Sequence, residues 1–133
     1  MIVAVADTHT VIWYLSNSTR LSVTVRSFFN RAAANNDQIA ISSISFIEII
    51  YLIEKGKIPT ESLNDLATAI AEANSVLVEI PLDLRVARSL LNVVGRKVPD
   101  MPDRIIVATA LYLQVPLITK DSQIIASGIP TIW

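Results

Sequence analysis

Short apolar runs alternate along the chain with segments in which apolar residues recur every three or four positions. The runs have the length of buried strands and lie at residues 2–6, 38–42, 75–80 and 115–119, with a last short strand at 131–133. The helical pattern covers residues 8–15, a longer segment capped by Ser22, and residues 45–55, 60–73 and 83–94, with a short turn after residue 121. Strands that alternate with helices predict a mostly parallel sheet covered by helices on both faces. At 133 residues, we expect a single domain spanning 1–133.

The most informative segment begins at Asp100. Asp100, Asp103 and Arg104 fall within five residues, and the nine residues that follow, 105–113, carry no charge. This composition predicts a helix that is buried on nearly every side. We therefore expect its first turn to hold carboxylates at the edge of the hydrophobic core.

Further acids are expected at the same edge of the sheet. Asp7 follows the first strand, Glu48 lies in the first turn of the helix after the second strand, and Asp121 follows the fourth strand. Because the carboxyl ends of parallel strands share one edge, we expect these three side chains to lie near Asp103. Asp100 is expected at the rim of this group.

Clustered carboxylates raise one another's pKa and cost stability unless a cation is present. Oxygen ligands without histidine or cysteine favour Mg²⁺ or Mn²⁺, and the chain contains no cysteine. Carboxylates that hold such ions are typical of enzymes that cleave phosphodiester bonds. The pattern therefore predicts a metal-dependent phosphodiesterase.

Each acid also has a purely structural explanation. Ser45-x-x-Glu48 matches a capping box, and Asp103 follows a proline in the first turn of its helix. Asp7 and Asp121 are at positions where turn residues are common. Four coincidences on one edge are less probable than one shared site, so we favour the metal site.

The charge balance is compatible with a polyanionic substrate. The chain has 11 basic and 12 acidic residues, and setting the four predicted site acids aside leaves 8 acids, a remainder of +3. Arg104, Lys120 and Arg96 are the predicted substrate contacts. The single histidine, His9, has two interpretations, a proton shuttle or a packing residue at a helix start.

The chain is unusually apolar for its length. Hydrophobic residues make up 52% and the mean hydropathy is +0.51, so we expect self-association or a protein partner. The N-terminal residues lack the pattern of a signal peptide, and no apolar run is long enough to span a bilayer. We therefore expect a cytoplasmic protein without a membrane partner.

Four segments resemble the motifs of PIN-domain nucleases, and of VapC-type ribonuclease toxins in particular. They are residues 5–13 (VADTHTVIW), 44–49 (ISFIEI), 100–104 (DMPDR) and 117–121 (LITKD). The motifs occur in order and cover essentially the whole chain. In the third, Met101-Pro102 stands where the family has Pro-Phe.

The resemblance implies a three-layer α/β/α sandwich and an endoribonuclease that depends on Mg²⁺ or Mn²⁺ and hydrolyses RNA. It further implies a toxin of a toxin–antitoxin pair, which forms a homodimer and is neutralised by a small cognate antitoxin. The metal-binding and catalytic acids would be Asp7, Glu48, Asp103 and Asp121. By the same resemblance Thr119 would support them, and we also expect Thr8 and Asp100 to be supporting residues.

Other functions stay open at this point. A PIN-like fold can serve as an inactive binding or scaffold module, and an active one can process RNA or cleave DNA. A phosphoacceptor receiver domain also places an acid after its first strand and uses a threonine and a lysine. That class fits less well, because no aspartate ends the third predicted strand.

Overall fold

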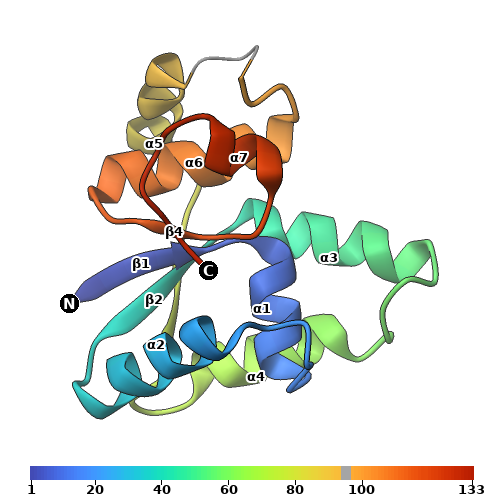
Figure 1. Ribbon diagram of the computed structural model, residues 1–133. Helices are drawn as coiled ribbons and strands as arrows, with labels where there is room; N and C mark the ends of the chain where they lie inside the picture. The colour runs from blue at the N-terminus through green and yellow to red at the C-terminus, as the bar shows by residue number, and fades with distance from the viewer. Residues whose placement is uncertain (94–96) are drawn as a thin grey trace.

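The computed structural model describes residues 1–93 and 97–133, and it is built around a five-stranded sheet (Figure 1). The strands are β1 (Ile2–Ala6), β2 (Gln38–Ser42), β3 (Leu77–Ile80), β4 (Leu117–Ile118) and β5 (Thr131–Ile132). All neighbouring pairs are parallel and the order is β3-β2-β1-β4-β5. In a receiver domain the first strand lies between the second and third, so this order excludes that class.

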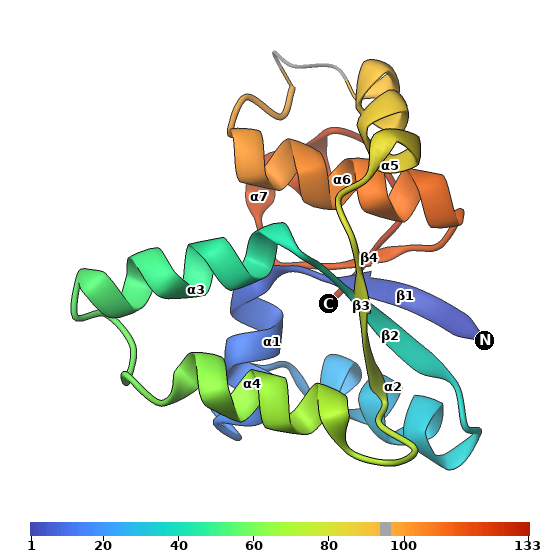
Figure 2. The same cartoon turned by 180° about the vertical axis from the view of Figure 1, so that it is seen from behind.

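Helices cover both faces of the sheet, as the predicted three-layer sandwich requires. The helices are α1 (Thr8–Leu15), α2 (Val23–Ala34), α3 (Ile44–Glu54), α4 (Ser62–Ala71), α5 (Leu84–Ser89), α6 (Met101–Leu113) and α7 (Ser122–Ala126), with a 3₁₀ turn at Leu90–Asn92. Helices α1 to α4 contribute to one hydrophobic cluster, and α5 to α7 contribute to another. Figures 1 and 2 show α1, α2 and α4 on one side of the strands and α5 to α7 on the other, with α3 extending beyond the end of β2.

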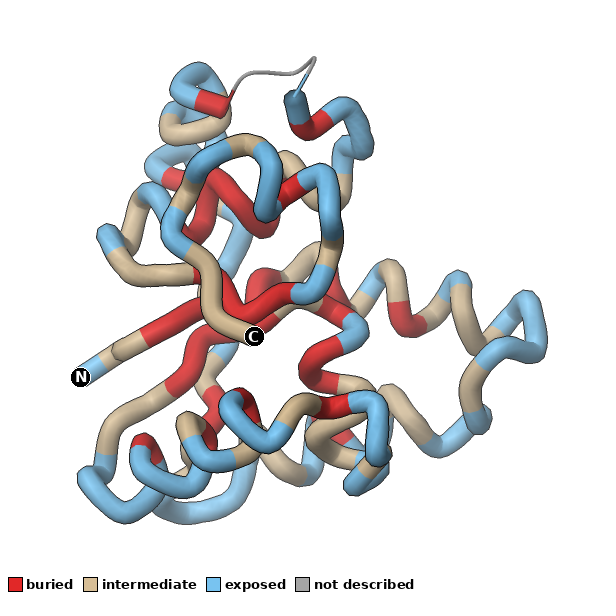
Figure 3. Tube along the Cα trace, viewed as in Figure 1, coloured by how far each residue is buried: buried red, intermediate tan, exposed pale blue. Residues whose placement is uncertain are grey.

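The central strand β1 is buried from both sides. Ala4 and Ala6 belong to the cluster beneath α1 to α4, whereas Val5 belongs to the cluster beneath α5 to α7. Successive side chains of a strand point to opposite faces, so a strand covered on both sides needs apolar residues at every position. In Figure 3 the buried segments accordingly run through the middle strands and through α6.

Helix α6 confirms the expectation of a buried central helix. Every residue from Ile105 to Ala110 is buried. Asp100 caps its start, because the Asp100 carboxylate accepts a hydrogen bond from the Asp103 N–H at 3.1 Å. The helix ends at Gln114, whose φ of 56° is left-handed and allows the chain to turn into β4.

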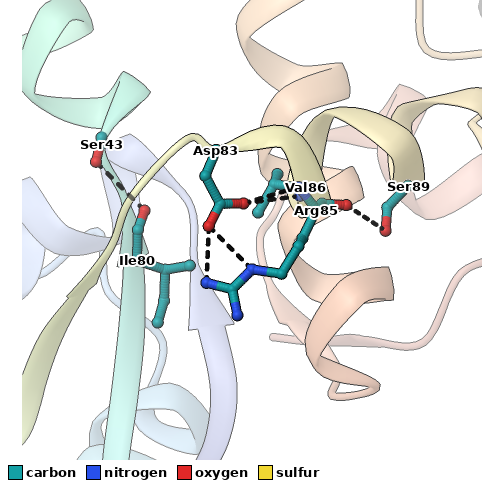
Figure 4. Close-up of polar contacts among 6 residues, drawn as sticks. All are labelled: Ser43, Ile80, Asp83, Arg85, Val86 and Ser89. Atoms are coloured by element: carbon teal, nitrogen blue, oxygen red, sulfur yellow. Dashed lines mark hydrogen bonds and ion pairs between the residues drawn. The ribbon is translucent and has the colours of Figure 1, made fainter.

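The predicted helix at 83–94 is wrong in its second half. Asp83 caps α5 by accepting the N–H groups of Arg85 and Val86, and it also pairs with the Arg85 guanidinium (Figure 4). The α-helix then gives way to the 3₁₀ turn, and the backbone at Val93 is extended. Val93 is buried in the cluster beneath α5 to α7, so packing of this side chain competes with continuation of the helix. Val94 lies outside the described residues.

Strands β3 and β4 are shorter than their apolar runs. The sequence predicts strands at 75–80 and 115–119, and the structure forms them only at Leu77–Ile80 and Leu117–Ile118.

Within the described ranges, no helix is long and apolar enough to cross a membrane.

Candidate metal centre

The four predicted acids line one cavity of about 260 Å³. Its lining residues are Asp7, Thr8, His9, Trp13, Arg20, Glu48, Asp103, Ile106, Lys120 and Asp121. The acids come from the end of β1, the second turn of α3, the first turn of α6 and the loop after β4. The prediction that Glu48 lies in the first turn of its helix is wrong, because α3 already begins at Ile44. The starts of α1, α3 and α6 therefore converge at the carboxyl ends of the central strands, as we expected for a parallel sheet.

Asp7 is the most firmly held of the four acids. One oxygen accepts the Thr10 backbone N–H at 2.9 Å and the Thr10 hydroxyl at 2.6 Å. The other accepts the hydroxyl of Thr119 at 2.5 Å. Asp7 is thus the N-cap of α1 and at the same time a carboxylate fixed at the wall of the cavity.

Glu48 is held by a hydroxyl from a different element. Thr8 donates to Glu48 Oε1 at 2.5 Å, and the Thr8 hydroxyl also contacts the Ser45 hydroxyl at 2.9 Å. The capping-box explanation is therefore wrong, because the N-cap of α3 is Ser43 and its side chain makes no capping hydrogen bond. Burial raises the pKa of Glu48, and the Thr8 hydrogen bond opposes that rise.

Asp103 carries the largest electrostatic strain at the site. Burial, followed by the charges of Asp100, Asp121, Glu48 and Asp7, raises the pKa of the Asp103 carboxyl from 3.8 to about 7. No group in the described part of the chain donates a hydrogen bond to this carboxylate. A positive charge in the cavity would relieve the repulsion.

Asp121 is the N-cap of the short helix α7. Its Oδ1 accepts the backbone N–H groups of Gln123 and Ile124 at 2.9 and 3.0 Å. The Asp121 N–H donates to the Thr119 hydroxyl at 3.0 Å. Thr119 therefore links Asp7 to Asp121, and this buried hydroxyl fixes the spacing between the two acids.

The remaining predicted site residues are distributed unevenly. Thr8 and Lys120 line the cavity. Asp100 is exposed and outside the lining, where it caps α6 and adds negative charge near Asp103. Arg104 is also outside the lining, and its Nη2 lies 3.4 Å from the Val93 carbonyl. Arg96 lies outside the described residues.

Sequence reasoning did not identify Trp13, Arg20 or Ile106 as part of the site. Ile106 lines the cavity because the cavity lies next to the first turns of α6. Arg20 reaches the cavity from the loop after α1. The sequence of that loop has no hydrophobic periodicity from which the position of Arg20 could have been predicted.

The chemistry of the donors fits a hard divalent cation. The four acids offer carboxylate oxygens only, which suits Mg²⁺ or Mn²⁺. In residues 1–93 and 97–133, however, no three acidic or histidine side chains are already close enough to hold an ion together. The acids thus surround a cavity with the right kind of ligand, and the side chains must approach one another to complete a coordination shell.

We expect the Thr119 hydroxyl to contribute more to the free energy of unfolding than an ordinary buried hydroxyl. Thr119→Val leaves an Asp7 oxygen and the Asp121 N–H without a partner, so the free energy of unfolding should fall by about 2 kcal/mol or more. Urea denaturation measures the loss. Thr109→Val is the matched control, because this buried hydroxyl bonds only the Ile105 carbonyl of its own helix. Equal losses in both variants would contradict a special role for Thr119.

The raised pKa of Asp103 predicts that the stability of the metal-free protein decreases as the pH rises. The folded chain binds the Asp103 proton more tightly than the unfolded chain, so the free energy of unfolding should decrease as the pH rises from about 4 to about 7. Asp103→Asn should be more stable than wild type at pH 8 and close to it at pH 4.

Urea denaturation in EDTA at both pH values measures this difference. Asp65→Asn, at an exposed acid of α4, serves as the control. A gap between wild type and Asp103→Asn that is independent of pH would contradict the electrostatic account.

Known proteins of similar sequence and structure are consistent with this geometry. The sequence model of the PIN domain matches residues 4–127. The fold is similar to VapBC2 from Rickettsia felis bound to a promoter DNA fragment, with a TM-score of 0.72, 15% identity and 98% of both chains covered. It is also similar to DNA-bound VapBC from Salmonella typhimurium, with a TM-score of 0.69, 22% identity and coverage of 99% of this chain and 98% of that one.

A toxin–antitoxin complex from Klebsiella pneumoniae is a further structural neighbour, with a TM-score of 0.60, 24% identity and coverage of 98% of this chain and 96% of that one. No curated protein matches the chain significantly. At these identities the solved structures establish the fold alone. The family model covers nearly the whole chain, so the protein belongs to the PIN domain family.

Proposed function

We propose that the protein is a Mg²⁺- or Mn²⁺-dependent endoribonuclease that hydrolyses RNA phosphodiester bonds. One observation carries the proposal, namely four acids from separate elements that line a single cavity, one of them with its pKa raised to about 7. Membership of the PIN domain family supports it, since PIN-domain nucleases generally use divalent metals.

In this proposal, Asp7, Glu48, Asp103 and Asp121 hold the metal. A bound divalent cation would neutralise phosphate charge and lower the pKa of water at the site. The chain contributes the positions of the acids. Asp7 is fixed through both oxygens, Glu48 is held through Oε1, and Asp121 is held through Oδ1.

Asp103 has a separate part in the proposal. Its raised pKa means that the carboxyl group carries a proton for much of the time at neutral pH in metal-free protein. Because a carboxylate must be deprotonated to bind a cation, loading of the site releases this proton. Metal affinity should consequently be lower below pH 7 than above it.

Lys120 and Arg20 are the basic side chains that line the cavity, and both are exposed to solvent. We assign them to the phosphates of the substrate. We do not assign Arg104, which the sequence predicted as a substrate contact, to the substrate, because its guanidinium is directed toward the Val93 carbonyl.

We further propose that the protein is the toxin of a toxin–antitoxin pair. The VapBC neighbours support this, and so does an apolar groove of about 290 Å³ that shares Trp13 and Arg20 with the acidic cavity. A segment of an antitoxin lying in this groove would be next to the acids. The groove runs between α1 and the α3–α4 pair, which projects from the sheet in Figures 1 and 2.

The proposed homodimer uses a different surface. Leu82 and Leu84 are 45% and 64% exposed, and both line an apolar groove of about 310 Å³ with Ile105 of α6. Exposed leucines beside an apolar groove favour contact with another protein.

Two alternatives remain, an inactive PIN-like scaffold and a PIN nuclease that processes cellular RNA. The fixed Asp7 and the strained Asp103 argue against a scaffold, because a protein without a ligand at this site gains nothing from buried repulsion. A processing nuclease would share the active site and differ in its partners.

Asp7→Asn should abolish RNA cleavage while the fold is retained. The asparagine side chain can still cap α1, but it removes a charged ligand, so the rate should fall by more than about 100-fold. Purified protein is assayed on single-stranded RNA with Mg²⁺ and with EDTA, and circular dichroism verifies the fold. Glu54→Gln, at an exposed acid of α3, should keep wild-type activity. Full Mg²⁺-dependent cleavage by Asp7→Asn would remove Asp7 from this role.

Leu84→Lys should weaken self-association at micromolar concentration. The substitution places a charge in the apolar groove proposed for the dimer, and sedimentation velocity measures the shift toward monomer. Val23→Lys is the control, since Val23 is 83% exposed at the start of α2 and does not line this groove. A wild-type protein that sediments as a monomer and co-purifies with no small partner would contradict the proposed assembly.

A further inference from the structure

One wall of the acidic cavity is aromatic and basic. His9, Trp13, Arg20 and Lys120 line it beside the acids. The His9 and Trp13 rings are 5.5 Å apart, tilted by 47°. The Trp133 ring meets the Trp13 ring edge-on at 5.9 Å, which supports the indole from outside the cavity.

Lys120 is held by this wall and not by the acids. Its Nζ lies 5.3 Å from the centroid of the Trp13 ring and 5.9 Å from that of the Trp133 ring. Ion pairs within the described residues join Met1 to Asp37 and Asp83 to Arg85, and none of these four residues lines the cavity. Although Lys120 directly precedes Asp121, its ammonium group is thus available to bind an anion.

The wall has a fixed position relative to Asp7. His9 and Trp13 are four residues apart on α1 and share one face of the helix. Asp7 caps the same helix, and at 1.5 Å per residue Trp13 lies about 9 Å further along the axis. His9 is exposed and Trp13 is half-buried, so the rings present a surface at the mouth of the cavity.

We propose that His9, Trp13 and Lys120 form a subsite for one nucleotide of single-stranded RNA, next to the bond that is cleaved. The base stacks on the exposed His9 ring and contacts the Trp13 ring, which is tilted by 47° to it, at an angle, and the phosphate binds the Lys120 ammonium. This inference rests on the proposed nuclease function. Trp133 is a positioning residue, because it holds Lys120 and Trp13 without lining the cavity. Stacking on aromatic rings tolerates every base, so the subsite selects unpaired RNA and not a particular sequence.

The experiment separates the base from the phosphate. Asp7→Asn protein in Mg²⁺ binds fluorescein-labelled octauridylate RNA or a phosphodiester of the same length without bases, and anisotropy gives each affinity. The RNA should bind between about 5-fold and about 150-fold more tightly than the chain without bases. His9→Ala should reduce this ratio, and His9→Phe, which keeps a flat ring, should retain it.

Lys120 is tested by a different readout. Lys120→Gln should weaken both probes by the same factor and reduce the slope of log affinity against log salt by about 0.7. Arg31→Gln is the matched control, since Arg31 lies 5.9 Å from the Phe28 ring on α2, away from the cavity lining. It should change neither quantity.

Equal affinity for the two probes, or a ratio unchanged by His9→Ala, overturns the subsite. Failure of both probes to bind, while wild-type protein cleaves RNA, overturns it as well. Loss of the proposed nuclease function has a separate signature, which is the absence of any Mg²⁺-dependent cleavage by the wild-type protein.

Discussion

Repulsion among carboxylates at one edge of the sheet is the constraint on which the site depends. The parallel sheet brings the ends of β1 and β4 together, and the buried helix α6 delivers Asp103 to the same place. Burial and four neighbouring acids raise the pKa of Asp103 to about 7, so the fold keeps an arrangement that is unfavourable without a cation. Hydroxyl groups from Thr8, Thr10 and Thr119 offset part of this cost by donating to Glu48 and Asp7.

Structural and chemical explanations of these acids do not exclude one another. Asp7 and Asp121, for which the structural interpretation was a turn residue, are N-caps in the structure, and both still line the cavity. A cap uses the oxygen that faces the backbone N–H groups, and in Asp121 this is Oδ1 alone. Asp100 is the contrasting case, because it caps α6 while lying outside the cavity lining. Capping therefore orients a carboxylate, and the position of the helix start decides whether that carboxylate faces the site.

The sequence predicted the parts of the site that follow from periodicity and topology. An apolar run that ends in an aspartate gave Asp7, and the uncharged stretch after Asp103 gave the buried helix α6. Contacts between distant segments were not predictable in this way. The spacing of Ser45 and Glu48 suggested a capping box, but both side chains instead form hydrogen bonds with the Thr8 hydroxyl of α1. Arg20 was missed for the same reason, since its position depends on the path of a loop.

The aromatic wall explains how basic residues can coexist with a metal site made of acids. A lysine paired with Asp121 would occupy the place of a cation and lower the demand for one. The Lys120 ammonium instead lies over the faces of two indole rings. The rings attract the positive charge but do not neutralise it. The acids keep their unbalanced charge for a metal, and Lys120 keeps its charge for a phosphate. Trp13 and Trp133 thus separate opposite charges that adjacent positions in the sequence would otherwise bring together.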